Sequence, residues 1–406
     1  MVNNDISVPE IRFKGFIDDW TQRKLGEVTT KIGSGKTPKG GSSVYLRHGI
    51  PLLRSQNITN DAVDLSDVVY ISDEMDSEMA NSRVQIKDVL LNITGASIGR
   101  SAVYKHTTTA NVNQHVCIVR PTQDVNAEYL QLNLTSPNGQ QQIDNNQAGG
   151  GREGLNFQQI AKIEFHFPTL PEQTAIGTFF RTLDELLAAT QRKVTLLKQL
   201  KAAYLQQMFP QARERVPRVR FGGFTEPWEQ KKLEYYFVER SERSGNGELI
   251  SVTINFGVVK ASELDRQIIS SDDKSNYKSV KIDDIAYNSM RMWQGASGYS
   301  QYDGILSPAY TVITPNEVAH SPFFAYLFKK LDMIQIFQRN SQGLTSDTWN
   351  LKFPAFSQIE VYAPLVDEQK VIANFFKLLD DKIDVNAQRI AQLQQLKSAY
   401  LQKMFV

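Results

Sequence analysis

Residues 172–209 read EQTAIGTFFRTLDELLAATQRKVTLLKQLKAAYLQQMF, and residues 368–405 read EQKVIANFFKLLDDKIDVNAQRIAQLQQLKSAYLQKMF. The two stretches are identical at 17 of 38 positions, with their aromatic and methionine positions in register. Neither contains proline, and apolar residues recur every three or four positions, which is typical of an amphipathic α-helix. Each stretch predicts one helix of roughly 38 residues, or about 57 Å at 1.5 Å per residue.

These two helices are expected to pair as an antiparallel coiled coil. A lone helix of this length would leave its apolar stripe in water, and pairing would cover it. Burial of each helix in an ordinary globular core is the alternative. The side chains expected at the pairing, or at a surface where a partner protein docks, are Phe179, Phe180, Leu197, Tyr204, Phe375, Phe376, Leu393 and Tyr400.

The rest of the chain is duplicated too. The stretch VPEIRFKGF at 8–16 matches VPRVRFGGF at 216–224 with an offset of 208, whereas residues 88–92 match 284–288 with the offset of 196 that relates the helices. A net twelve residues are therefore lost between these points, where the first copy contains KIGSGKTPKGGSSVYLRHGIPLLRSQN. The two copies share their repeated segments but differ in the inserted segment, which predicts one architecture with two different recognition specificities.

The sequence predicts an α+β protein with a pseudo-twofold layout. Two mixed α/β domains, 1–168 and 213–365, are expected to be separated by the long helices, 169–212 and 366–406. Strand-like runs of apolar residues occur at 102–104, 116–119, 163–167, 310–313 and 359–362, and short helices are expected at 127–134 and 322–331.

The charges of the chain are balanced but unevenly distributed. Forty-five Lys and Arg face 44 Asp and Glu, and this balance argues against a uniformly basic protein that coats nucleic acid. Residues 28–60 and 89–123 nevertheless contain no acid, and neither does 285–302, where Arg291 is accompanied by Trp293 and three tyrosines. Cations neutralise phosphates, and Arg, Asn and Gln can contact base edges. Each stretch alone could be a solvated loop, but together they favour nucleic-acid binding.

No catalytic or metal-binding pattern is complete. The stretch 33–37, GSGKT, resembles a phosphate-binding loop, but Thr30 stands where the pattern needs glycine and Pro38 interrupts the following helix. The sequence has no Asp/Asn-Pro-Pro-aromatic run of an amino-methyltransferase. Glu368-Gln369-Lys370 could suggest a nuclease, but its place at a helix start predicts a capping and surface role.

The remaining composition predicts no metal site and a cytoplasmic location. The five histidines are scattered without paired spacing, so no metal site is expected. The single cysteine, Cys117, permits no intramolecular disulfide, which fits a reducing compartment. No apolar run is long enough to cross a membrane.

Several motifs together resemble one known family. They are GKTP at 35–38, IPLLRSQNI at 50–58, DVLL at 88–91 followed by TG at 94–95 and IG at 98–99, YNSMRMWQG at 287–295, and PEQ at 171–173 before the first long helix. The second copy has DEQ at 367–369, where aspartate replaces the proline. On these motifs the chain resembles, over essentially its whole length, the specificity (S) subunit of type I restriction-modification systems.

This resemblance implies a non-catalytic subunit. The two target-recognition domains would each bind one half of a split double-stranded DNA sequence, and the helices would set the gap between the halves. The subunit would dock two modification (M) subunits, which methylate a flipped adenine with S-adenosylmethionine, and restriction (R) subunits, which use ATP. No cofactor is then expected in this chain, while S-adenosylmethionine, ATP and Mg²⁺ are expected in its partners. A self-contained DNA-modifying enzyme and a coiled-coil scaffold that binds only protein are the alternatives.

The candidate DNA-binding residues come from the acid-free stretches and their surroundings. For the first half-site they are Lys36, Thr37, Lys39, Arg54, Gln56, Asn57, Thr94, Ser97 and Arg100. For the second half-site they are Asn255, Asn288, Arg291, Trp293, Gln294, Ser297 and Tyr299.

Overall fold

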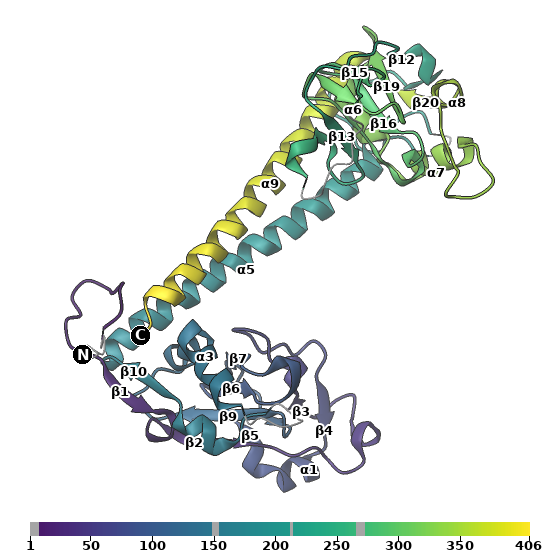
Figure 1. Cartoon of the computed structure of the whole chain (residues 1–406). Helices are drawn as coiled ribbons and strands as arrows, with labels where there is room; N and C mark the ends of the chain where they lie inside the picture. Colours follow the sequence, from purple (N-terminus) through teal and green to yellow (C-terminus); the bar gives the residue numbers. More distant parts are fainter. Residues whose placement is uncertain (1–7, 148–153, 212–213, 265–272) are drawn as a thin grey trace. The chain divides into compact units, whose positions relative to one another are not determined.

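The computed structural model describes the chain as two compact units (Figure 1). The first unit comprises Met1–Gln191 and Gln388–Val406, and the second comprises Arg192–Ala387. Both long helices therefore contribute to both units. The structure describes residues 8–147, 154–211, 214–264 and 273–406.

The first unit is built from two four-stranded sheets and one two-stranded sheet. Their strand orders are β2-β9-β6-β7, β4-β3-β8-β5 and β1-β10, and all neighbours are antiparallel except β3 and β8. The strands are β1 (Thr21–Lys24), β2 (Thr29–Ser34), β3 (Ile50–Leu53), β4 (Val69–Ile71), β5 (Arg83–Val84), β6 (Val89–Asn92), β7 (Ser101–Val103), β8 (Ala110–Val112), β9 (Val116–Pro121) and β10 (Glu164–Phe167).

The second unit repeats this plan with smaller outer sheets. Its four-stranded sheet has the order β12-β19-β16-β17, and the pairs β11-β20, β13-β14 and β15-β18 complete it. The strands are β11 (Glu229–Lys232), β12 (Phe237–Glu239), β13 (Ile250–Thr253), β14 (Gly257–Lys260), β15 (Lys278–Val280), β16 (Ile285–Asn288), β17 (Ser297–Tyr299), β18 (Gly304–Leu306), β19 (Tyr310–Pro315) and β20 (Glu360–Ala363).

Short helices cover the sheets, and two long ones extend from them. In the first unit the short helices are α1 (Asp73–Glu78), α2 (Ala127–Thr135), α3 (Pro137–Asn146) and α4 (Phe157–Lys162); in the second they are α6 (Ser321–Leu327), α7 (Leu331–Asn340) and α8 (Phe353–Ser357). The long helices are α5 (Leu170–Gln207) and α9 (Val366–Lys403), each of 38 residues, as the sequence predicts.

The strand register confirms the duplication. Val89 pairs with Val119 and Val103 in the first unit, and its counterpart Ile285 pairs with Ile313 and Tyr299 in the second. The strands expected at 102–104, 116–119, 163–167, 310–313 and 359–362 overlap β7, β9, β10, β19 and β20.

The prediction of a single helix at 322–331 is wrong, because two separate helices occupy this region. Helix α6 ends at Leu327 and α7 begins at Leu331. Lys329 and Lys330 donate their amide hydrogens to the carbonyls of Tyr326 and Leu327, three residues back, and Lys330 then turns to an extended conformation. The tightened turn ends the first helix and starts a second one in a new direction.

Equivalent aromatic contacts join the two long helices in each unit. In the first unit the rings of Phe179 on α5 and Tyr400 on α9 meet edge to face, with centroids 5.0 Å apart. In the second unit Tyr204 on α5 and Phe375 on α9 repeat this contact, also at 5.0 Å. Leu197 packs against the second core, and Leu393 is half-buried.

The neighbouring phenylalanines have a different role. Phe180 and Phe376 are fully buried in the cores of their units, where they lie 6.0 Å and 6.1 Å from the rings of Phe405 and Phe209. The Met-Phe pair that is repeated after each long helix thus completes a core. Phe405 stacks on Tyr129 in the first unit, and Phe209 stacks on Phe323 in the second.

The Glu-Gln pair at the start of each long helix is buried, so the expected surface role is wrong. Glu172 and Glu368 each accept two hydrogen bonds from one guanidinium, that of Arg12 or Arg220, at 2.6–2.8 Å. Gln173 and Gln369 each donate to the carbonyl of the residue five positions earlier, at 2.8 Å. The arginine contacts fasten the N-terminal segment of each domain to the first turn of its long helix, and the glutamine contacts hold the residues that lead into that helix.

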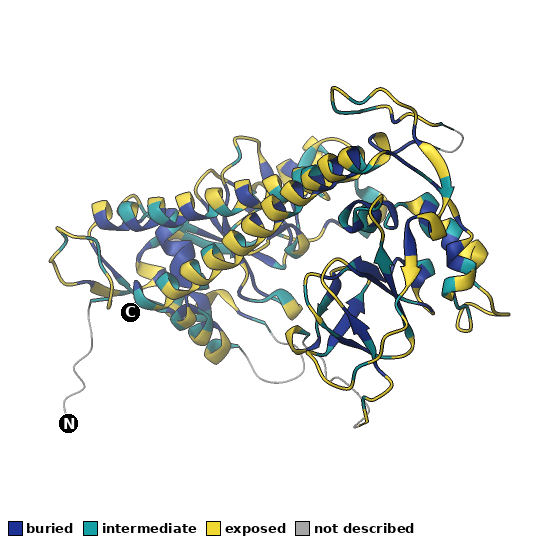
Figure 2. Ribbon diagram, turned by 90° about the horizontal axis from the view of Figure 1, so that it is seen from above, coloured by how far each residue is buried: buried dark blue, intermediate teal, exposed yellow. Residues whose placement is uncertain are grey.

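The outward faces of the long helices are largely exposed (Figure 2). Each unit has its own apolar core beneath a polar surface. Among the described residues, no helix has the length and apolar character that a membrane span requires.

Arg220→Met should destabilise the second unit by about 3 kcal/mol, because it leaves the buried Glu368 carboxylate without its partner. Glu368 is 2% exposed, and the guanidinium holds both of its oxygens. Urea unfolding measures the change.

Arg218→Met is the matched control. Arg218 lies two residues away and is 67% exposed in its pair with Glu214, so its loss should change stability by less than about 0.5 kcal/mol. Equal effects of the two substitutions would contradict the role of the Arg220–Glu368 pair.

Candidate nucleic-acid interface

A hollow of about 440 Å³ in the first unit gathers candidate residues from separate parts of the sequence. Three segments form it: the turn after β3, the β6–β7 connection and the β8–β9 turn. Its lining residues are Ser55, Gln56, Thr94, Gly95, Ala96, Ser97, Arg100 and His115. Four of these were predicted from sequence, namely Gln56, Thr94, Ser97 and Arg100. No acidic side chain belongs to this described lining, so the hollow suits an anionic ligand.

Buried amides hold the 54–67 loop that forms one wall of this hollow. The Asn57 side chain accepts from the Arg54 amide and donates to the carbonyls of Asp64 and Asp67, at 3.0–3.1 Å. Asn92 donates to the Ser55 carbonyl at 2.9 Å. Asn57 is 2% exposed. We therefore correct its expected role from direct DNA contact to support of the loop.

A hydrogen-bonded chain connects the two acid-free stretches of the first unit. The Thr37 hydroxyl donates to the side chain of Gln114, which lies 3.1 Å from Nε2 of His115. Nδ1 of His115 is 2.6 Å from the Thr94 hydroxyl inside the hollow. Lys36 and Lys39 are exposed but do not line the hollow.

The glycine in the GKTP motif serves packing. A Cβ on Gly35 would lie 1.7 Å from the Val112 carbonyl oxygen, so only glycine allows this approach. Gly35 also donates its amide hydrogen to the Asn113 carbonyl at 3.2 Å. The GKTP motif, which directly follows β2, thus packs against the β8–β9 turn beside the hollow.

Three candidate side chains near the hollow differ in whether other groups of the protein already engage them. Arg100 is exposed. Gln56 donates to the Asp67 carboxylate at 2.7 Å, and Arg54 donates to the Asp67 carbonyl at 3.2 Å. To contact a base edge, Gln56 would have to break its hydrogen bond to Asp67. The exposed Arg100 side chain would need no such rearrangement to contact DNA.

The second unit presents its candidates on the β16–β17 connection. Arg291 is exposed and donates to the Gln294 side chain at 3.2 Å. Trp293 packs edge to face on Trp349, with centroids 5.1 Å apart, and donates to the Met290 carbonyl. Asn288 accepts from the Met290 amide at 3.0 Å, which shapes the turn.

The other candidates of the second unit are spread around this turn. Asn255 is exposed at the tip of the β13–β14 hairpin. Tyr299 is half-buried, and its hydroxyl accepts from Gln301. Ser297 is fully buried in β17, where Gly298 packs directly on Gly257, so its expected DNA contact is corrected to a packing role.

Lys329 is a residue that the sequence analysis missed. Its ammonium donates to the carbonyls of Ile254 and Gly295, at 2.7 Å and 2.5 Å, and so joins the β13–β14 hairpin to the β16–β17 turn. Burial, followed by repulsion from Lys201, lowers the pKa of Lys329 to about 8. The residue stands outside the acid-free stretches, and its contacts are with backbone atoms, so no sequence pattern indicates it.

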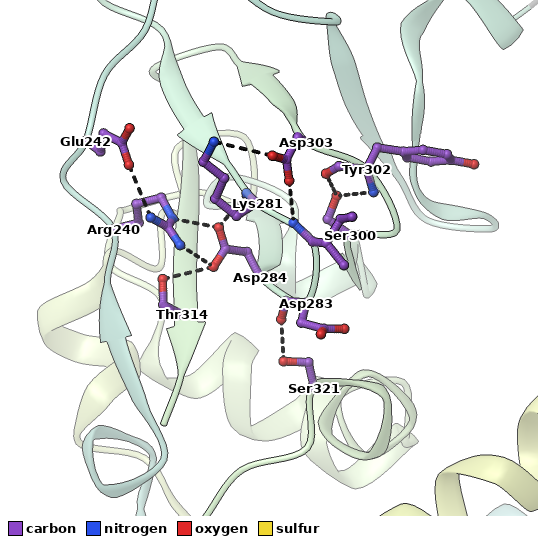
Figure 3. A network of polar contacts seen from close by, with 11 residues as sticks. Arg240, Glu242, Lys281, Asp283, Asp284, Ser300, Tyr302, Asp303, Thr314 and Ser321 are labelled. Atoms are coloured by element: carbon purple, nitrogen blue, oxygen red, sulfur yellow. Dashed lines mark hydrogen bonds and ion pairs between the residues drawn. The ribbon is translucent and has the colours of Figure 1, made fainter. Parts of the chain in front are cut away.

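A buried ion pair lies at the start of β16, at the end of the β16–β17 hairpin away from the turn (Figure 3). Asp284, just before β16, accepts from Arg240 at 2.6 Å and 3.0 Å and from Thr314 at 2.9 Å. In the first unit the counterpart Asp88 is held by Arg120, which occupies the β9 position equivalent to Thr314. The equivalent carboxylate is thus paired with an arginine in both units, which comes from β9 in the first unit and directly follows β12 in the second.

The second unit also has a pocket that the sequence analysis did not predict. It measures about 280 Å³ and contains none of the candidates. Its lining residues are Glu239, Lys278, Ser289, Pro308, Ala309, Tyr310, Thr311, Asn350, Lys352, Phe353 and Pro354.

Comparison with known proteins identifies the family. The family model described as "Type I restriction modification DNA specificity domain" matches twice, at residues 17–199 and 226–395. The chain belongs to this family. It is a type I restriction-modification specificity subunit with two recognition domains, and the repeat found in the sequence corresponds to the two matches.

Curated relatives and solved structures agree with this assignment. The chain is 22% identical over 403 residues to a protein described as the type I restriction enzyme MjaX specificity subunit of Methanocaldococcus jannaschii, covering 94% of this chain and 91% of the relative. It is 28% identical over 144 residues to the EcoBI specificity subunit of Escherichia coli, covering 35% of this chain and 30% of the relative.

The fold is that of a solved S subunit. The type I restriction-modification system S subunit from M. genitalium superposes with a TM-score of 0.60 at 15% identity, covering 98% of this chain and 99% of that chain. In the described parts of the chain, no group of three or more His, Cys, Asp or Glu side chains is arranged to hold a metal ion.

Arg291→Ala should weaken binding of the assembled complex to its cognate DNA by roughly tenfold, about 1.4 kcal/mol, because we expect its exposed guanidinium to contact base edges or phosphates. Competition binding against unrelated DNA measures the change. Lys231→Ala, on the exposed strand β11, removes the same charge and should leave the affinity within twofold. Equal affinity of the Arg291→Ala and unaltered complexes at every site would contradict the placement.

Proposed function

We propose that the two recognition domains bind the two halves of a split double-stranded DNA sequence. The observation that carries this proposal is the family match over both domains, since each match contains one set of acid-poor candidate loops. The hollow of the first unit and the β16–β17 turn of the second occupy corresponding places, after β6 and after β16. Different side chains on equivalent loops favour two different half-sites.

The two long helices would form an antiparallel coiled coil that sets the gap between the half-sites. The Phe179–Tyr400 and Tyr204–Phe375 contacts support this, since each joins one end of α5 to the opposite end of α9. Two lysine–aspartate pairs, Lys397–Asp184 and Lys201–Asp380, also cross from helix to helix. The pseudo-twofold layout would divide the chain into domains 1–168 and 213–365 and helices 169–212 and 366–406.

The chain would select DNA for catalytic partners rather than act on it. Two M subunits would bind S-adenosylmethionine and methylate the DNA, and R subunits would use ATP and Mg²⁺, all in the cytoplasm. A solved chain from work on complex assembly of the type I R-M system has a TM-score of 0.50 with this one and supports assembly into such a complex. Docking would use helix surfaces near Phe179 and Phe375.

Selection from a random DNA library tests this function. The chain reconstituted with its M subunit should enrich one split sequence with a fixed gap and methylate it, whereas the chain alone should do neither. Methylation or cleavage by the chain alone would favour a self-contained enzyme. A complex that enriches no sequence would favour a protein-only scaffold.

A seven-residue insertion in both helices should widen the gap by about three base pairs. Seven residues preserve the helical phase of the apolar stripe and add about 10 Å, and successive base pairs are 3.4 Å apart. Insertions after Gln191 and after Ala387 fall at equivalent positions of the repeat. Library selection should return unchanged half-sites, and altered half-site bases with an unchanged gap would contradict the spacer.

A further inference from the structure

The repeat preserves one lysine and one aspartate on each long helix. Asp184 and Lys201 on α5 correspond to Asp380 and Lys397 on α9, with the offset of 196. In each unit, the lysine of one helix contacts the aspartate of the other.

In the first unit the lysine also contacts the recognition domain. Nζ of Lys397 lies 2.6 Å from Asp184 on α5 and 2.5 Å from Asp61 in the 54–67 loop. The ammonium side chain is 14% exposed. A single cation thus connects α9, α5 and the loop that carries Gln56 to the hollow.

Asp61 is held firmly for this contact. Gln131 on α2 donates to its other carboxylate oxygen at 2.7 Å, and the Asp61 amide donates to the Ser101 carbonyl at 3.1 Å. The Asp61 backbone has φ of +71°, a left-handed conformation that is uncommon outside glycine. Its carboxylate therefore has one defined position against Lys397.

In the second unit the same helix charges meet a different domain residue. Nζ of Lys201 lies 2.5 Å from Asp380, and the hydroxyl of Tyr326 on α6 donates to the other Asp380 oxygen at 2.8 Å. The ammonium also lies 5.2 Å from the centre of the Tyr326 ring. The helix part of the contact is thus duplicated, while the domain part is a carboxylate in one unit and a phenol in the other.

We propose that these two lysine–aspartate pairs are positioning sites that fix the angle of each recognition domain on the helices, with Asp61 and Tyr326 as the domain contacts. Apolar packing is non-directional and tolerates small rotations, whereas an ammonium shared by groups on three segments permits one arrangement. The inference rests on the proposed function, because that angle would decide which gap brings both half-sites into contact at once.

The test uses the complex reconstituted with its M subunits and DNA that carries both selected half-sites. The measured quantity is the ratio of methylation rates at the cognate gap and at a gap one base pair longer. Lys397→Met should lower this ratio at least threefold without changing the half-site bases. The ratio compares two substrates in one sample, so partial loss of folded complex does not alter it.

Three further variants separate positioning from general structure. Asp61→Asn keeps the acceptor for Gln131 but removes the charge facing Lys397, and it should lower the ratio by a smaller factor. Lys397→Asp combined with Asp184→Lys keeps an ion pair between the helices but sets a carboxylate against Asp61, so it should leave the ratio lowered. Lys377→Met removes an exposed lysine paired within α9 and should leave the ratio unchanged.

An unaltered ratio in both Lys397→Met and Asp61→Asn would overturn the inference. If Lys397→Met yields no folded complex, the isosteric Asp61→Asn variant decides alone. A wild-type complex that selects no split sequence would instead refute the proposed function. The two failures are therefore distinguishable.

Discussion

The contact between α5 and α9 is the constraint on which the rest of the structure depends. A helix of 38 residues with an apolar stripe cannot cover that stripe by itself, and burial of the apolar surface favours association with a second helix. Phe179 and Phe375 accordingly meet Tyr400 and Tyr204 with the same geometry. Each helix then ends in a Met-Phe pair that completes a domain core. Pairing of the helices and folding of the domains are thus parts of one set of contacts.

The two copies share the contacts at the start of each long helix, and they differ in the loops that hold the candidate DNA-binding residues. Glu172 and Glu368 hold equivalent arginines, and Gln173 and Gln369 hold equivalent carbonyls. The β6–β7 and β16–β17 connections carry different candidate side chains at equivalent positions, for example Ser97 where the second copy has Trp293. We propose that this division lets one architecture recognise two DNA half-sites while the separation between them stays constant.

The sequence predicted the frame better than the site. Long uninterrupted helices follow from local periodicity and the absence of proline, so α5 and α9 could be foreseen in their extent. Burial of Glu172 and Gln173 could not, because charged and polar residues at a helix start usually face solvent. Asn57 and Ser297 were misjudged for a related reason, since composition does not tell a base-contacting amide or hydroxyl from one that supports a loop. Lys329 was missed because its partners are backbone carbonyls from distant segments.

The central claim is that this chain selects a split DNA sequence on behalf of a methylating partner. Methylome sequencing of cells that carry the chain with its M subunit tests this most directly, against cells that carry the M subunit alone. The account predicts methylation at one sequence with two specific halves and a fixed unspecified gap, only when the chain is present. Methylation of a continuous sequence, or the same pattern without the chain, would contradict it.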